Sequence, residues 1–324
     1  MSATMPGTAM PAGFTIRAPR IEDAAEVAAL VNVRSLADTN AATMSVSDLL
    51  VSWEDPERNL EDEDWLVIAS DRQIVAFMEL YQYEPFTVFE FDCHVHPSFG
   101  GLGIEQVLLE IIEARARREM HRAPDGERVV LHTYVPGTAT DGHRLLVAHG
   151  FDHIRDSLQM LIDLDDVPDV RWPAGITVRP LVRNHDEHAV WETVDEVWKD
   201  HWGYESMPFN EFCYYHIDAV TSFDPTLWHL AMDGDRIAGI ALCKSDKAGF
   251  ENTGWISLLG VRRQYRGSGI GLALLQHVFA DFRKRGYAHV GLGVDASSLT
   301  GADRLYRRAG MREIKREFIF EKPI

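Results

Sequence analysis

A cluster of glycines in the C-terminal half of the chain could bind a phosphate group. Gly267, Gly269 and Gly271 follow an apolar segment and precede a long helical pattern. Such a loop presents backbone N–H groups at the positive end of a helix, where anions are stabilised, and glycines keep side chains out of the way. Arg266 adds a permanent positive charge. The pattern indicates a site for a phosphorylated ligand, with a simple tight turn as the alternative.

Two common kinds of phosphate-binding loop do not match this segment. No Lys-Ser or Lys-Thr pair follows the glycines, as a loop for a nucleoside triphosphate requires. The Gly-x-Gly-x-x-Gly spacing of dinucleotide folds is also missing. Such folds place their loop after the first strand, whereas several predicted strands precede this one. The loop therefore indicates another class of phosphorylated ligand.

The elements around the loop are typical of a domain that mixes helices and strands. The segment 255–261 is apolar along almost its whole length, as expected of a strand covered on both faces. The strand, the glycine loop and the helix thus form the centre of an α+β domain. Apolar periodicity and turn residues predict strands at 177–181, 227–232, 236–244, 255–261, 290–294 and 312–321, and helices at 188–198, 210–218, 272–285 and 300–309.

The same sequence pattern occurs twice in the chain. Residues 15–19 match 177–181, residues 95–105 match 261–271, and residues 145–151 match 305–311. Three matches in the same order, at nearly constant separation, indicate two copies of one domain. The sequence predicts a loose leader at 1–13, a first copy at 14–165, a linker at 166–175 and a second copy at 176–324.

Composition narrows the class of protein. A length of 324 residues is typical of two domains. The formal net charge of −18 argues against a general nucleic-acid binder and favours an amine-bearing substrate only weakly. Cys93, Cys213 and Cys243 lack the spacing of metal ligands or redox pairs, so we interpret them as reduced thiols of a cytoplasmic protein. No segment resembles a membrane span or a secretory signal.

The loop and its surroundings resemble motif A of the GNAT superfamily of acyl-CoA N-acyltransferases, whose signature is Gln/Arg-x-x-Gly-x-Gly/Ala. Arg266, Gly269 and Gly271 occupy its three defining positions. Because the resemblance extends over both halves, the architecture is similar to the tandem GNAT arrangement of the mycothiol synthase group. It implies two α+β domains, each with a mixed, mostly antiparallel sheet and helices on both faces.

The resemblance also implies where acetyl-CoA, the co-substrate, binds. Loop amides would hold the pyrophosphate, the preceding strand would bond the thioester and pantetheine, and residues after the next strand would line the exit of the pantetheine arm. No metal is implied. The residues assigned in this way are Leu259, Val261, Arg266, Gly267, Ser268, Gly269, Ile270, Gly271, Leu272, Asp295, Ser298 and Thr300.

Tyr306 matches the position at which the family places its general acid. A phenol suits the protonation of a departing thiolate, because its pKa near 10 keeps it protonated at neutral pH. The general base stays open, since the strand before the loop lacks the carboxylate that some family members place there. Glu251, just before that strand, is a candidate, and so are Asp195, Asp200 and His201.

The first copy departs from the motif at three positions. Gly100 stands where the motif has Arg or Gln, Glu105 replaces the last glycine, and Leu146 replaces the tyrosine. A carboxylate in a phosphate site repels the ligand. We therefore expect catalysis only in the second copy and a structural role for the first.

Together these features predict an N-acetyltransferase that moves an acetyl group from acetyl-CoA to a primary amine, on a small molecule, by direct attack of the amine on the thioester. Two alternatives stay open: a non-catalytic acyl-CoA-binding scaffold, and a peptide or protein N-acetyltransferase. Neither nucleic acid nor membrane is an expected partner. The sequence leaves the oligomeric state undetermined, and a monomer is compatible with it because the two copies can pack on each other.

Overall fold

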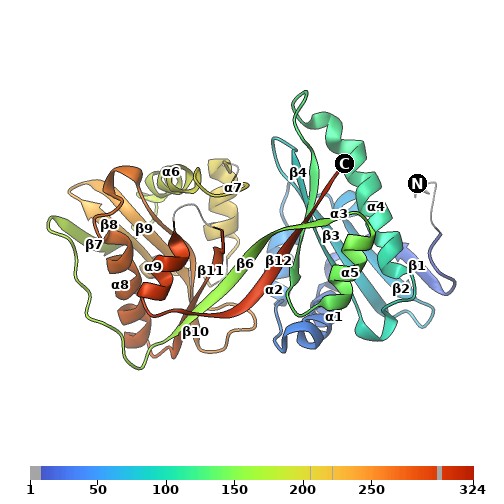
Figure 1. The fold of residues 1–324 in the computed structure, drawn as a ribbon, viewed down its shortest axis with the longest axis horizontal. Helices are drawn as coiled ribbons and strands as arrows, with labels where there is room; N and C mark the ends of the chain where they lie inside the picture. The colour runs from blue at the N-terminus through green and yellow to red at the C-terminus, as the bar shows by residue number, and fades with distance from the viewer. Residues whose placement is uncertain (1–8, 205, 221, 298–300) are drawn as a thin grey trace. The chain divides into compact units, whose positions relative to one another are not determined.

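Figure 1 shows the computed structural model, which describes residues 9–204, 206–220, 222–297 and 301–324. The chain forms two compact units. The N-terminal unit comprises Met1–Ile154 and Glu317–Ile324, and the C-terminal unit comprises Arg155–Arg316. Among the described helices, none is long and apolar enough to cross a membrane.

The N-terminal unit is built on a mixed sheet. Its strands are β1 (Phe14–Arg17), β2 (Asp64–Ala69), β3 (Ile74–Gln82), β4 (Val88–Val95), β5 (Val130–Pro136) and the end of β12 (Arg312–Pro323), and its helices are α1 (Ala24–Thr39), α2 (Val46–Trp53), α3 (Leu60–Glu63), α4 (Ile104–Glu119) and α5 (Thr140–Ala148). The strand order is β1-β2-β3-β4-β5-β12, with only β4 and β5 parallel. Helices α1 and α2 pack on Leu66 and Phe77, whereas α4 and α5 pack on the side of Val67 and Met78. Since adjacent strand residues point to opposite faces, helices cover both faces.

The C-terminal unit repeats this plan. Its strands are β6 (Asp152–Asp163), β7 (Ile176–Pro180), β8 (Trp228–Asp233), β9 (Arg236–Lys244), β10 (Thr253–Val261) and β11 (His289–Asp295), and its helices are α6 (Glu187–Trp198), α7 (Phe209–Cys213), α8 (Ile270–Lys284) and α9 (Ala302–Arg308). The order is β6-β11-β10-β9-β8-β7, with only β10 and β11 parallel. Helices α6 and α7 pack on Leu230 and Ile240, and α8 and α9 pack on the opposite side with Ala231 and Ala241.

The predicted fold class is confirmed: both units are α+β, with mixed, mostly antiparallel sheets between helices. The helix predicted at 210–218 is α7 followed by a π-helical turn at Tyr214–Asp218. The helix predicted at 300–309 is α9, and residue 300 lies outside the described part of the chain. The three cysteines form no disulfide.

The sheet of each unit is completed by a strand from a distant part of the sequence. Residues 157–163 of β6 pair with β11 in the C-terminal unit, and residues 317–323 of β12 pair with β5 in the N-terminal unit. The compact units therefore begin and end at other residues than the two predicted sequence copies, 14–165 and 176–324. The division into these copies stays a prediction. Residues 1–8 of the predicted leader lie outside the described residues, and Met10 packs against the N-terminal core.

The arginine of the first strand is held in the same way in both units. Arg17 makes two hydrogen bonds to Asp23, of 2.6 and 2.8 Å, and Arg179 makes two to Asp186, of 2.5 and 2.9 Å. Asp186 is buried and also accepts the N–H of Val182 at 2.8 Å. The bond from Arg179 holds the pKa of the Asp186 carboxyl well below its usual range. The repeated first-strand motif thus forms an ion pair that fixes the start of the first helical region.

We expect Asp186→Asn to lower the free energy of unfolding of the C-terminal unit by about 2 kcal/mol at pH 7, because hydrogen bonds to charged groups contribute about 1.5–3 kcal/mol. The folded pKa lies below the ordinary value near 4. The contribution is therefore fully present above about pH 4 and is lost as the pH falls further. Urea unfolding from pH 7 to pH 3 measures it, with exposed Glu192→Gln as the control. A difference from wild type that did not shrink at pH 3 would contradict the assignment.

Candidate active site

Strands β10 and β11 separate towards their carboxyl ends. They pair in parallel from Thr253 opposite His289 to Ile256 opposite Leu292. Both continue further, to Val261 and Asp295, without pairing with each other in the described residues. β10 instead stays paired with β9, with a bulge that shifts the register between Ile256 and Leu258, and β11 stays paired with β6 in one register. The two carboxyl ends therefore leave backbone groups available to a ligand that enters between them.

The glycine loop begins where β10 ends. Gly267 and Gly269 have φ angles of +78° and +94°, which favour glycine, and Gly269 caps the start of α8. The first hydrogen bond of α8 runs from the N–H of Ala273 to the carbonyl of Gly269 at 3.1 Å. The N–H groups of Ile270 and Gly271 precede this bond, so they point out of the helix end, where an anion is stabilised.

Gly271 has a second role that the sequence did not indicate. A Cβ at this position would lie 3.2 Å from Leu305 and 3.6 Å from Val261. Leu305 belongs to α9, directly before Tyr306. The missing side chain of Gly271 therefore lets α9 approach the loop, which places the candidate acid near the candidate cofactor site.

Arg266 connects the loop to the end of α6. Its Nε donates to the carbonyl of Val261 at 3.1 Å, and its Nη1 lies 2.5 Å from Oδ2 of Asp200. Arg263 binds the other carboxylate oxygen of Asp200. The guanidinium groups of Arg263 and Arg266 lower the pKa of Asp200 to about 2. Asp200, one of the predicted base candidates, is thus an ionised partner of two arginines.

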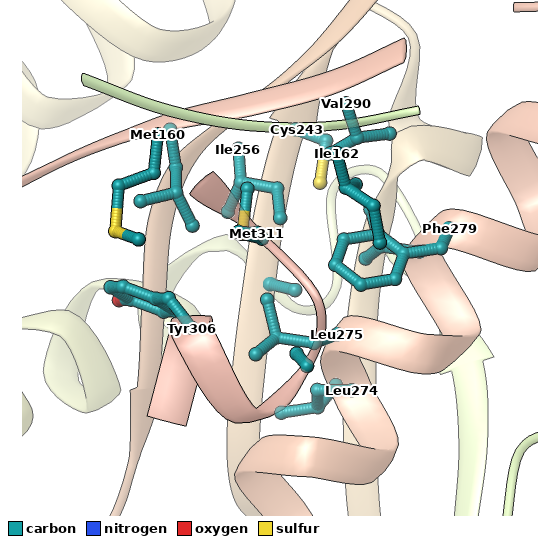
Figure 2. Packing of buried hydrophobic residues seen from close by; sticks show 14 of the residues in the cluster. Met160, Ile162, Cys243, Ile256, Leu274, Leu275, Phe279, Val290, Tyr306 and Met311 are labelled. Carbon is teal, nitrogen blue, oxygen red and sulfur yellow. The ribbon is translucent and has the colours of Figure 1, made fainter. Parts of the chain in front are cut away.

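Tyr306 lies in the hydrophobic cluster beneath the separated strands. Its side chain is buried, and burial raises the pKa of its phenol to about 12. Figure 2 shows the ring beside Met160, a residue of β6, and Leu274 and Leu275 of α8 belong to the same cluster. The phenol therefore keeps its proton at neutral pH, as a general acid must.

Asp295, at the end of β11, is paired with a residue from the first half of the sequence. Its Oδ2 lies 2.6 Å from Nη1 of Arg155 in β6, and its Oδ1 accepts the N–H of Ser297 at 2.8 Å. The Arg155 guanidinium also lies over the ring of Trp202, 4.8 Å from its centroid. Sequence reasoning missed Arg155, because nothing local shows that β6 joins this sheet. The assigned residues Ser298 and Thr300 lie outside the described residues.

The family model for acetyltransferases of the GNAT family matches residues 33–151 and again residues 189–311. The chain belongs to the GNAT family. It is an acyl-CoA-dependent N-acetyltransferase with two GNAT domains in tandem, which confirms the resemblance. GNAT acetyltransferases use acetyl-CoA as the acetyl donor.

Several known proteins are similar to this GNAT chain over most of its length. The mycothiol acetyltransferase of Geodermatophilus obscurus is 30% identical over 76% of this chain and 78% of its own. That of Thermomonospora curvata is 28% identical over 71% and 72%. A GCN5-related N-acetyltransferase from Sphaerobacter thermophilus has a TM-score of 0.80 and 35% identity, with 97% of both chains covered. A tandem GNAT protein of clavulanic acid biosynthesis, at 16% identity and a TM-score of 0.71 over 96% and 98%, shares the fold.

Glu251 lies far from the loop of this GNAT domain. It is exposed, and it precedes β10 at the end opposite Val261. A strand rises about 3.3 Å per residue, so the two ends of β10, Thr253 and Val261, are about 26 Å apart. The structure therefore does not bring Glu251 to the loop, which argues against the predicted role of this carboxylate as the base.

The N-terminal GNAT domain has the same backbone plan with different chemistry. β4 and β5 pair only from Val88 to Glu90, and Gly103, with a φ of +89°, caps α4 as Gly269 caps α8. The Glu105 carboxylate lies against this loop, and a Cβ at Gly100 would be 3.7 Å from its Oε1. Leu146 is buried in the hydrophobic cluster. The N-terminal domain thus has a carboxylate at its loop and a leucine at the position that corresponds to Tyr306. Both features support the expectation that this domain is not catalytic.

Proposed function

We propose that the C-terminal unit transfers the acetyl group of acetyl-CoA to a primary amine on a small molecule. One observation carries the proposal: the separated ends of β10 and β11 and the glycine loop lie in one unit with Tyr306. The relatives named mycothiol acetyltransferase support an acceptor of low molecular weight.

The donor would be held mainly by backbone groups. A Cβ at Gly267 would meet no atom within 4 Å, so the outer side of the loop is open to a ligand. The N–H groups from Gly267 to Leu272, including those of Ser268 and Ile270, would bind the pyrophosphate, with Arg266 beside them. The backbone of Leu259 and Val261 would bond the thioester arm from the edge of β10, and Asp295 would flank it on β11.

Tyr306 would act as the general acid. As the amine nitrogen forms its bond to the thioester carbonyl carbon, the C–S bond breaks and the electron pair goes to sulfur. The phenol gives its proton to that thiolate, and solvent returns a proton to the phenolate. The acylated nitrogen loses one proton to a base, so the products are an amide and the CoA thiol. Burial raises the pKa of Tyr306, so its proton is present at neutral pH when the thiolate leaves.

Three measurements on the whole chain test the proposal. We expect calorimetry to show saturable binding of acetyl-CoA, and a thiol-release assay over a panel of small primary amines to show turnover with at least one. Mass spectrometry should find the acceptor heavier by one acetyl group. Binding of acetyl-CoA without thiol release for any amine would show a non-catalytic binder, and turnover with peptides alone would show a peptide N-acetyltransferase.

A further inference from the structure

The end of α6 packs against the part of β10 that β11 does not cover. A Cβ at Gly260 would lie 2.5 Å from Cγ2 of Val197 and 3.0 Å from Cζ3 of Trp198. Gly260 is therefore required for this close approach, because a methyl group would push the helix end away. The residues that follow Trp198 consequently lie beside the separated strands, where the thioester would be held.

His201 is held at this place by two contacts of its own and by the ion pairs of its neighbour Asp200. Its imidazole stacks on the indole of Trp198, with ring centroids 5.0 Å apart and an interplanar angle of 10°. Its backbone N–H donates to the carbonyl of Trp198 at 2.7 Å. The preceding residue, Asp200, is bound to Arg263 and Arg266 of the glycine loop. The imidazole thus has a defined position at the end of α6, next to a residue that is bound to the loop.

The charged groups that act on His201 come from three elements. The carboxylates of Asp295 on β11 and of Asp200 raise its pKa, and the Arg266 guanidinium lowers it. Burial is the largest influence, and it brings the pKa below the ordinary value of 6.5. Arg155, bound to Asp295, offsets part of that carboxylate's effect. The imidazole is therefore neutral at pH 7 and able to accept a proton.

The other acidic side chains of this region are less suited than His201 to accept a proton. Asp200 is bound by two arginines, Asp295 by Arg155, and Asp195 lies 2.7 Å from the ammonium group of Lys199. A carboxylate that is stabilised by a cation in its ionised form is a weak base.

We propose that His201 is the general base of acetyl transfer. The proposal rests on the proposed function. As the amine nitrogen bonds to the thioester carbonyl carbon, it becomes positively charged, and the imidazole nitrogen takes one of its protons. The C–S bond then breaks, sulfur keeps the electron pair, and Tyr306 protonates it. The imidazolium releases its proton to solvent, so the products are one amide and one CoA thiol.

Replacement of His201 by glutamine tests the role. We expect kcat for an accepted amine to fall about 100-fold, while the Kd for acetyl-CoA and the unfolding midpoint stay within about twofold and about 2 °C of wild type. The wild-type kcat should decline in acid with a midpoint below pH 6.5, and His201→Gln should lack that decline. Imidazole added to His201→Ala should restore part of the rate. His188→Gln, an exposed histidine on α6, is the matched control and should keep wild-type kcat.

The outcomes separate the two proposals. If wild type acetylates an amine and His201→Gln retains at least about a third of its kcat, His201 is not the base, and the proposed function stands. If kcat falls but the acid decline persists and imidazole restores nothing, the role is structural and the proposal is overturned. If wild type itself acetylates no amine, the proposed function fails, and the role of His201 fails with it.

Discussion

Tyr306→Phe is expected to lower kcat for acetyl transfer by about 10²–10⁴-fold, the range typical of a lost general acid. The Kd for acetyl-CoA should change by less than about twofold, because the proposed donor contacts come from the loop and strand backbones. The phenol is buried in a hydrophobic cluster, so phenylalanine fits the same space. Single-turnover thiol release, followed with the accepted amine, measures the effect on the chemical step.

Tyr287→Phe is the matched control for this change. Tyr287 packs against the same hydrophobic cluster, with its ring centroid 5.0 Å from that of Phe282. Tyr287→Phe therefore removes an equivalent hydroxyl outside the proposed site, and we expect this variant to keep the wild-type kcat. A Tyr306→Phe enzyme whose kcat stayed within about threefold of wild type would show that another group protonates the thiolate.

Gly271→Glu should weaken the binding of acetyl-CoA by about 100-fold or more. It places in the C-terminal loop the residue that the N-terminal loop has at Glu105. Two like charges about 4 Å apart repel by about 4 kcal/mol near a protein surface, which is more than a hundredfold in binding. The backbone of Gly271 is helical, so the helix itself accepts a side chain. Calorimetric titration with acetyl-CoA measures the change.

Gly271→Gln separates charge from size. Its side chain has nearly the same shape, and its Cβ meets Leu305 in the same way at 3.2 Å. We expect a loss of about tenfold or less for this neutral variant. Glu105→Gln, in the N-terminal unit, should leave the affinity of the C-terminal site unchanged. Equal losses for Gly271→Glu and Gly271→Gln would show that packing, and not charge, governs this position.

The sequence alone determined features that depend on local rules. Glycine is favoured where φ is strongly positive, so the loop around Gly269 and its twin around Gly103 could be located from residue types. Apolar periodicity located most strands and helices of the second copy, and the order of three matched segments showed the duplication. The loop sequence also carried the family resemblance, because it is contiguous. The proposed acid, Tyr306, lies in a second contiguous motif.

The tertiary structure decided which distant residues meet. No sequence rule shows that β6 pairs with β11, or that the end of β12 pairs with β5, since any strand edge offers the same backbone donors and acceptors. That pairing brings Arg155 to Asp295, 140 residues away. The approach of Trp198 to Gly260 likewise places His201 at the separated strands, whereas Glu251 lies at the other end of β10. The loop was therefore predictable from local conformation, whereas the position of the candidate base depended on long-range packing.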